Sequence, residues 1–206
     1  MKRTRSFLFA LALLTSFQMF AQKEETIVGG RNFGWTGLWG GYKHQLTQFG
    51  EETSYINGGF FGFEFGKSLL LGWGRYSLVD EFKWDNIENQ DFDMRWYPFL
   101  VQYGFKGYKA VHPQLGFEIG RGRVDFGGAK DRILVVQPTA GVEFNVFRWF
   151  HLGLDGGYRF VTDSSTPGLS DEDLSGWMAQ ATLKFGFSWG RYNKKKANNK
   201  SKLYED

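Results

Sequence analysis

The sequence predicts an all-β fold, a closed antiparallel up-and-down barrel of about eight strands, on three observations. The 206 residues include 28 Gly, 22 Phe, 9 Tyr and 8 Trp against only 4 Pro, which favours twisted strands and aromatic girdles over helices. Apolar and polar residues alternate with a period of two. Short and long connections also alternate along the chain, as they do in up-and-down barrels. The absence of Cys excludes a disulfide framework and a thiolate metal site.

The first 21 residues have the form of a secretory signal peptide. A basic start, Met1 to Arg5, precedes an apolar run from Phe7 to Leu14, and Ala21 lies at the expected cleavage site. The apolar run is shorter than the roughly 20 residues that a membrane-spanning helix needs. We therefore expect residues 1–21 to be removed. Residues 22–32 would then lead into a barrel at 33–190.

The far end of the chain is basic. After removal of the signal peptide, Lys and Arg balance Asp and Glu at 22 each, but residues 191–206 carry six basic side chains against Glu205 and Asp206. Such a segment could meet anionic lipid or nucleic acid. We interpret it as a solvated, disordered periplasmic tail and expect no nucleic-acid partner.

Alternation is clearest in the second half of the chain. Segments near 115–119, 134–146, 150–160 and 177–189 each place apolar residues on one face and polar or small residues on the other. In the last segment the apolar face consists of Trp177, Ala179, Ala181, Leu183, Phe185, Phe187 and Trp189. Apolar side chains outside and polar side chains inside are the pattern of a transmembrane barrel.

The first half is less regular. We expect strands near 33–47, 53–66, 69–84 and 92–105. Two aromatic pairs, Trp73 with Tyr76 and Trp96 with Tyr97, suggest a change of face, which a β-bulge beside Gly74 or Pro98 would explain.

The connections divide into two sets. Those at 66–68, 106–108 and 147–149 are short, whereas 85–91, 124–131 and 162–176 are longer and polar. If both chain ends are periplasmic, the short turns are periplasmic too, and the longer loops, together with 48–53, are extracellular. No apolar stretch after the signal peptide is long enough for a spanning helix, so a membrane role requires a closed barrel.

Two stretches carry a family resemblance. Residues 56–76, with Ile56-Asn57-Gly58 and Gly72-Trp73-Gly74-Arg75-Tyr76, form the first, and 167–176, from Pro167 to Gly176, form the second. With them the chain resembles small outer-membrane β-barrel proteins of Bacteroidetes whose function is unassigned. The resemblance implies a transmembrane barrel in the cell outer membrane and brings no catalytic residues with it.

Six charged residues are expected to face the lumen. In a barrel of eight strands the interior is just wide enough for side chains, so we expect these charges to pair across it and close it. A narrow ion path or gate is the alternative interpretation. The six are Glu64, Glu118, Glu143, Asp155, Arg159 and Lys184.

We find no motif for catalysis, metal or cofactor binding. His44, His112 and His151 stand in no recognised motif, and Asp155 lies about 13 Å along the strand from His151. The acidic segment 162–176 lacks the spacing of a calcium loop. Gly120 to Gly122 and Gly127-Gly128 lack the strand-to-helix context of a nucleotide site. We expect no enzyme, metal or cofactor.

The sequence therefore favours an outer-membrane barrel with a structural or loop-mediated binding function. Its partners would be outer-membrane lipid and, through the loops, an extracellular ligand or an envelope protein. The alternatives are a small-solute porin or transport component, a lipid-modifying outer-membrane enzyme, and a soluble lipocalin-like periplasmic barrel, whose outer face would be polar. The sequence indicates neither the ligand nor the oligomeric state.

Overall fold

The structure is a computed structural model that describes residues 34–50, 52–79, 82–83, 91–165 and 169–189. The chain divides into two units, Met1–Phe33 and Gly34–Asp206, and all described residues belong to the second. The predicted signal peptide, the lead-in at 22–32 and the basic tail at 191–206 lie outside the described residues.

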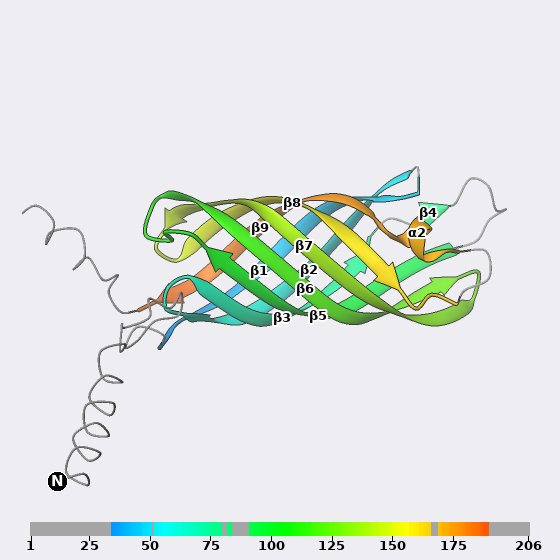
Figure 1. Ribbon diagram of the computed structural model, residues 1–206, viewed down its shortest axis with the longest axis horizontal. Coiled ribbons are helices and arrows are strands. Elements are labelled where there is room, and N and C mark those ends of the chain that lie inside the picture. Colours follow the sequence, from blue (N-terminus) through cyan, green and yellow to red (C-terminus); the bar gives the residue numbers. More distant parts are fainter. Residues whose placement is uncertain (1–33, 51, 80–81, 84–90, 166–168, 190–206) are drawn as a thin grey trace, which may run out of the picture. The chain divides into compact units, whose positions relative to one another are not determined.

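The second unit is a closed antiparallel barrel, which confirms the predicted fold class (Figure 1). Consecutive long strands pair with each other, and β1 pairs with β9 to close the circle. The short β4 extends the pairing of β3 along β5, so eight long strands form the wall. The elements are β1 (Trp35–Phe49), β2 (Glu52–Phe65), β3 (Leu69–Leu78), β4 (Phe82–Lys83), β5 (Asp91–Gly104), β6 (Val111–Phe126), β7 (Ala129–Phe147), β8 (Phe150–Thr162), α2 (Asp171–Leu174) and β9 (Gly176–Ser188).

The β-bulge predicted beside Gly74 or Pro98 does not occur. β3 and β5 keep one register over their paired length. The aromatic residues that suggested a change of face lie an odd number of positions apart, so a regular strand already places them on opposite sides. Thus Trp96 is fully buried while its neighbour Tyr97 is 54% exposed. The register shifts of the described barrel lie near the ends of β1 and β7.

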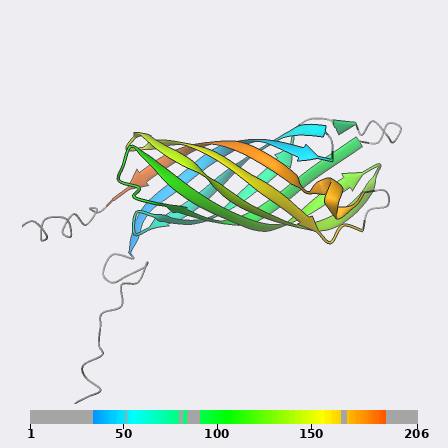
Figure 2. The same cartoon turned by 45° about the horizontal axis from the view of Figure 1, so that its top comes forward.

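The two ends of the barrel differ in their connections, as Figures 1 and 2 show. The end with the turns at 66–68, 105–110 and 148–149, where β1 begins and β9 ends, is called the terminal end. The opposite, loop end carries α2 and the connections after β1, β3, β6 and β8. The short turns were predicted correctly at the terminal end.

At the loop end, two of the four predicted loops are wrong. β1 and β2 leave only residues 50–51 between them instead of a loop at 48–53, and β6 and β7 leave only 127–128 instead of 124–131. Gly127 and Gly128 have φ values of 56° and 86°, which suits a two-residue hairpin turn. The charged residues that suggested a loop there belong to strands that continue beyond the apolar part of the wall.

The outer wall is apolar around the barrel. Large apolar side chains of every long strand point outward, and Leu46, Phe61, Trp73, Leu115 and Trp177 are 50–68% exposed. A soluble lipocalin-like barrel would have a polar outer face, so this alternative does not fit. Among the described residues, no helix is long and apolar enough to cross a membrane.

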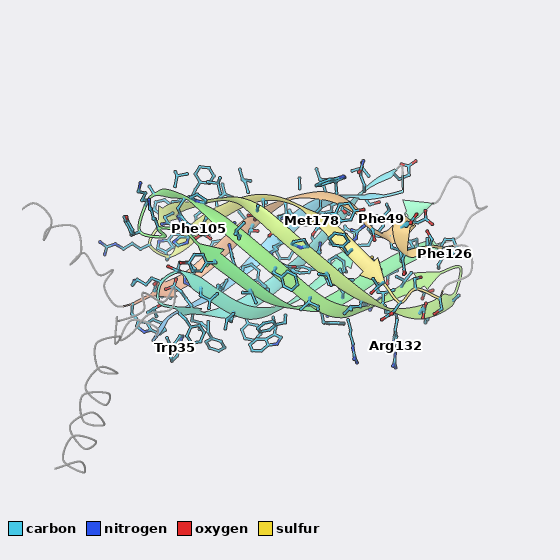
Figure 3. All side chains as sticks on the ribbon, viewed as in Figure 1. Trp35, Phe49, Phe105, Phe126, Arg132 and Met178 are labelled. Carbon is cyan, nitrogen blue, oxygen red and sulfur yellow. The ribbon has the colours of Figure 1, made fainter. Side chains whose placement is uncertain are left out.

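The interior has two parts, and Figure 3 labels residues of both ends. The loop half of the lumen holds a large apolar cluster that includes Phe49, Met94, Trp96 and Phe126, and Leu174 of α2 packs into it. The terminal half holds a smaller cluster of Trp39, Phe60, Leu70 and Leu100 among polar and charged side chains.

Candidate functional site

The lumen of the terminal half contains a cluster of charges centred on Glu143. Strand register places His112 of β6 directly beside Glu143 of β7, and His151 of β8 directly beside Lys184 of β9. The Glu143 carboxylate receives a hydrogen bond from Lys184 and lies 2.9 Å from Nδ1 of His151 and 3.5 Å from Nε2 of His112. The four side chains are at most 13% exposed. Charged side chains that are buried to this extent need partners of opposite charge or hydrogen bonds.

A second ion pair bridges the lumen. Lys43 of β1 contacts Glu118 of β6, and these strands lie four places apart in either direction around the eight long strands. The hydroxyl of Tyr76 lies 3.5 Å from the Glu118 carboxylate, and the Lys43 ammonium lies 5.5 Å from the ring centre of Phe60. A pair that joins opposite walls obstructs the middle of the lumen.

Asp155 is held by neutral amides. Its carboxylate accepts hydrogen bonds from Gln114, at 2.6 Å, and from Gln180, at 3.1 Å. Gln114, Gly141, Asp155 and Gln180 form one cross-strand row through β6, β7, β8 and β9. A Cβ atom at Gly141 would collide with the Asp155 side chain and the backbone of β8. Glycine at this position therefore leaves the space that the carboxylate occupies.

Glu64 lies near the terminal rim and also has neutral partners. It accepts hydrogen bonds from Thr36 at 2.8 Å, Trp39 Nε1 at 2.9 Å and Ser188 at 2.5 Å. These contacts join β2 to β1 and, through Ser188, to β9. Glu64 therefore stabilises the junction of β1 and β9 that closes the barrel at this end.

Arg159 is fully buried and holds the loop end closed. Its guanidinium donates to the backbone oxygens of Leu174 and Gln48, each at 2.9 Å, and to the hydroxyl of Thr47 at 2.8 Å. It also lies 3.9 Å from the ring centre of Phe49. No carboxylate within the described chain is at ion-pair distance from it. The prediction that Arg159 belongs to a charge pair across the lumen is therefore wrong.

Of the six predicted lumen residues, the structure brings one pair together, Glu143 with Lys184. Glu118 pairs with a cation that the sequence reasoning missed, and Glu64, Asp155 and Arg159 have neutral partners. The missed partners are Lys43, His112, His151, Gln114 and Gln180. Alternation in β6 already places Gln114 on the inward face with Glu118. The same period extended to His112 and to β1 would have placed His112 and Lys43 inside as well.

Two small hollows lie among the side chains in the middle and terminal parts of the lumen. A hollow beside Trp39, Glu143 and Lys184 has a volume of about 30 Å³, and another beside Lys43 and Asp155 has about 10 Å³. The first has room for a water molecule or two, and the second is at the lower limit for one.

The three histidines lie at two separate places in the barrel. His44 points outward on β1 and contacts the hydroxyl of Tyr55, while His112 and His151 both face Glu143. In the described chain, none of the three contacts a hydroxyl and a carboxylate together. The same residues contain no group of three or more metal-ligating side chains. The acidic side chains of the predicted loop partly cap α2, since Asp173 accepts from Ser170.

Comparisons with solved structures identify barrels of the same kind. The N-terminal β-barrel domain of Pseudomonas aeruginosa OprF is 11% identical over 75% of this chain and 99% of that one, with a TM-score of 0.50. Neisserial surface protein A is 14% identical over 74% and 96%, with a TM-score of 0.49. The outer membrane protein OprG of Pseudomonas aeruginosa is 11% identical over 77% and 98%, with a TM-score of 0.41. No protein family and no curated protein matches the chain.

Proposed function

We propose that this chain is an outer-membrane β-barrel protein with a closed, non-conducting lumen, which acts as a rigid scaffold for structure or for binding at its loop end. The observation that carries the proposal is the combination of an apolar outer wall with a lumen closed by paired charges and apolar packing. We propose no enzymatic activity.

The outer wall supports membrane insertion. The long strands contain 10–19 residues, and a tilted strand needs about 9–11 to cross a bilayer. Aromatic side chains collect at the terminal end, where Trp35 packs on Trp189 and Phe147 stacks on Trp149. Toward the loop end, Tyr158 packs on Trp177. Two aromatic girdles around an apolar band are typical of outer-membrane barrels, and the OprF domain shares this fold.

The lumen supports a non-conducting barrel. An ion crossing from end to end would have to displace the Lys43–Glu118 pair, the Glu143 cluster and the apolar cluster at the loop end. Strands hold both ion groups and most of the apolar cluster, to which Leu169 and Leu174 are added from the connection between β8 and β9. A small-solute porin is therefore the weaker interpretation, and conductance of the inserted protein distinguishes the two.

The described part of the loop end supports a binding function because its connection between β8 and β9 is held on the barrel. α2 begins with a capping box formed by Ser170 and Asp173, and the backbone N–H of Gly50 donates to the Asp173 carbonyl at 3.1 Å. Recognition commonly uses connections held on a rigid scaffold. An extracellular ligand or an envelope protein would bind here. The motifs at 56–76 and 167–176 also favour an origin in the Bacteroidetes barrel family.

The test is expression of the full-length chain in a Gram-negative host, followed by fractionation and gel mobility with and without heating. We expect recovery in the outer membrane and a band that shifts on heating, because a closed barrel resists unfolding by detergent. Recovery as a soluble periplasmic protein, or an outer-membrane band without a heat shift, would contradict the proposal.

A further inference from the structure

Five arginines point outward from four adjacent strands near the loop end. Register aligns three of them in one cross-strand row, Arg95 of β5 beside Arg123 of β6 beside Arg132 of β7. In the next row Arg121 of β6 lies beside Tyr97 of β5. Arg75 of β3 completes the set, 5.8 Å from the centre of the Tyr97 ring. These five residues are called the arginine surface, and all are exposed. Figure 3 shows Arg132 pointing away from the wall.

The arginine surface carries excess positive charge. Like charges directly opposite on neighbouring strands repel each other. Arg95 has a carboxylate partner, Asp93 at 2.7 Å. Arg121, Arg123 and Arg132 have no carboxylate at ion-pair distance in the described barrel. An external anion would therefore relieve repulsion that the described side chains do not neutralise.

The surface lies where the apolar wall ends. On each strand the next outward residue toward the terminal end is apolar: Phe99 beyond Tyr97, Ile119 beyond Arg121 and Leu134 beyond Arg132. Toward the loop end the outward residues become Asp93, Asp125 and Lys130. In the membrane orientation proposed above, the guanidinium groups stand at the level of the headgroups of the outer leaflet.

The charge is confined to one side of the barrel. Within the described parts of β8, β9, β1 and β2, no lysine or arginine points outward. An even ring of cations would suit general attraction to an anionic surface. A patch on one side suits instead a bound molecule that occupies one position.

The arginine surface also borders a hollow. This open depression of about 690 Å³ is lined by four arginines and one carboxylate, together with apolar and aromatic side chains: Arg95, Arg121, Arg123, Arg132, Asp163, Tyr97, Ile133 and Leu134. It combines a cationic rim with apolar side chains. That combination fits an amphipathic ligand with anionic groups at one end and acyl chains at the other.

We infer that the arginine surface binds a phosphorylated glycolipid of the outer leaflet, an inference that rests on the proposed outer-membrane location. The guanidinium groups donate paired hydrogen bonds to phosphate oxygens, and the acyl chains lie along the apolar wall beside Phe99 and Ile119. Phosphate recognition and acyl-chain contact together select a lipid over a soluble anion.

The experiment begins with protein refolded in neutral phosphatidylcholine nanodiscs and checked for the heat-shifted band. Binding of lipid A with two phosphates is then compared with binding of the same lipid A after phosphatase treatment. The test variant R121Q/R123Q/R132Q removes three charges from the arginine surface. The matched control K106Q/K109Q/R148Q removes three exposed charges at the terminal end.

We expect the test variant to bind phosphorylated lipid A on the order of a hundredfold more weakly than the unchanged protein, at about a fivefold loss for each of the three charges removed near a membrane surface. The control should bind within about twofold of the unchanged protein, since its charges lie at the opposite end of the barrel from the arginine surface. The dephosphorylated lipid should bind as weakly to the unchanged protein as phosphorylated lipid binds to the test variant.

Three results would overturn the inference. Equal binding of both lipids would remove phosphate as the determinant, and equal losses in the two variants would show unspecific attraction. Displacement of lipid A by millimolar inorganic phosphate would show a site for free anions.

The variant R121K/R123K/R132K keeps the charge and should retain part of the binding. A chain that fails to insert would contradict the proposed function, whereas an inserted chain without phosphate-dependent binding contradicts this inference alone.

Discussion

The two halves of the lumen are closed by different means. The loop half is packed with apolar side chains, with Met94 and Trp96 fully buried, and α2 covers it. The terminal half is filled by polar side chains and two ionic groups centred on Glu118 and Glu143. The loop half resembles the core of a soluble protein, in which truncation of a side chain leaves a destabilising cavity. The terminal half depends on the pairing of buried charges, so removal of one partner leaves the other charge buried and unpaired.

The largest effect should come from breaking a buried pair in the terminal half. Glu118→Leu leaves the Lys43 ammonium without its carboxylate in the middle of the lumen. We expect the free energy of unfolding in lipid vesicles, measured by urea titration of Trp fluorescence, to fall by about 3–5 kcal/mol.

The matched control for that variant is the double substitution Lys43→Met with Glu118→Leu. Since it removes both charges, it should recover most of the loss. Equal destabilisation of the single and double variants would show that the pair is not what closes the middle of the lumen.

A cavity in the loop half should cost somewhat less. Met94→Ala removes a fully buried side chain from the apolar cluster, and we expect a loss of about 2–4 kcal/mol in the same assay. Lys109→Ala, in an exposed turn outside the apolar wall, serves as the control and should cost less than about 1 kcal/mol. If the two variants behaved alike, the loop half would not be packed as described.

Loosening of α2, which covers the loop half of the lumen, should have a local effect. Arg159→Met removes the hydrogen bonds that join Leu174 to β1. Their loss should raise protease cleavage within 163–175 by roughly tenfold, since a hydrogen bond to a charged group contributes about 1.5–3 kcal/mol. Cleavage rates of the intact inserted barrel, read on gels, check this. Unchanged protection would mean that α2 is held by apolar contacts alone.

The smallest effect should follow from loss of the cap of α2. Ser170→Ala removes the side-chain acceptor for the Asp173 N–H, 3.2 Å away, at a cost of about 1 kcal/mol. Cleavage in the same segment should rise by a few-fold. An increase larger than that of the Arg159 variant would reverse the importance assigned to the two contacts.

The wall of the barrel could be predicted from sequence because lipid and lumen impose opposite demands on alternating residues. In β6, β7, β8 and β9 the residues predicted to face outward do so, which confirms the prediction. The loops at 48–53 and 124–131 were wrong because strands that extend beyond the apolar wall become charged on their outer face. Asp125 and Lys130 therefore look like loop residues in sequence, although they lie opposite each other in the regular ladder of β6 and β7.

The pairing inside the barrel was less accessible. Lys43 and Glu118 are 75 positions apart in sequence, and only the closure of eight strands places them opposite each other. Partners of Asp155 follow from register, since Gln180 lies directly beside it and Gln114 reaches it over Gly141. Alternation shows which side a residue faces, but the partner across the lumen depends on strand number and stagger.

The most direct test of the closed lumen is the conductance of the refolded, heat-shifted protein in planar bilayers. The charge pairs and the apolar cluster predict a silent bilayer, without discrete current steps at moderate voltage and salt. Steady, stepwise conductance that scales with the amount of inserted protein would contradict the account and make the small-solute porin the correct interpretation.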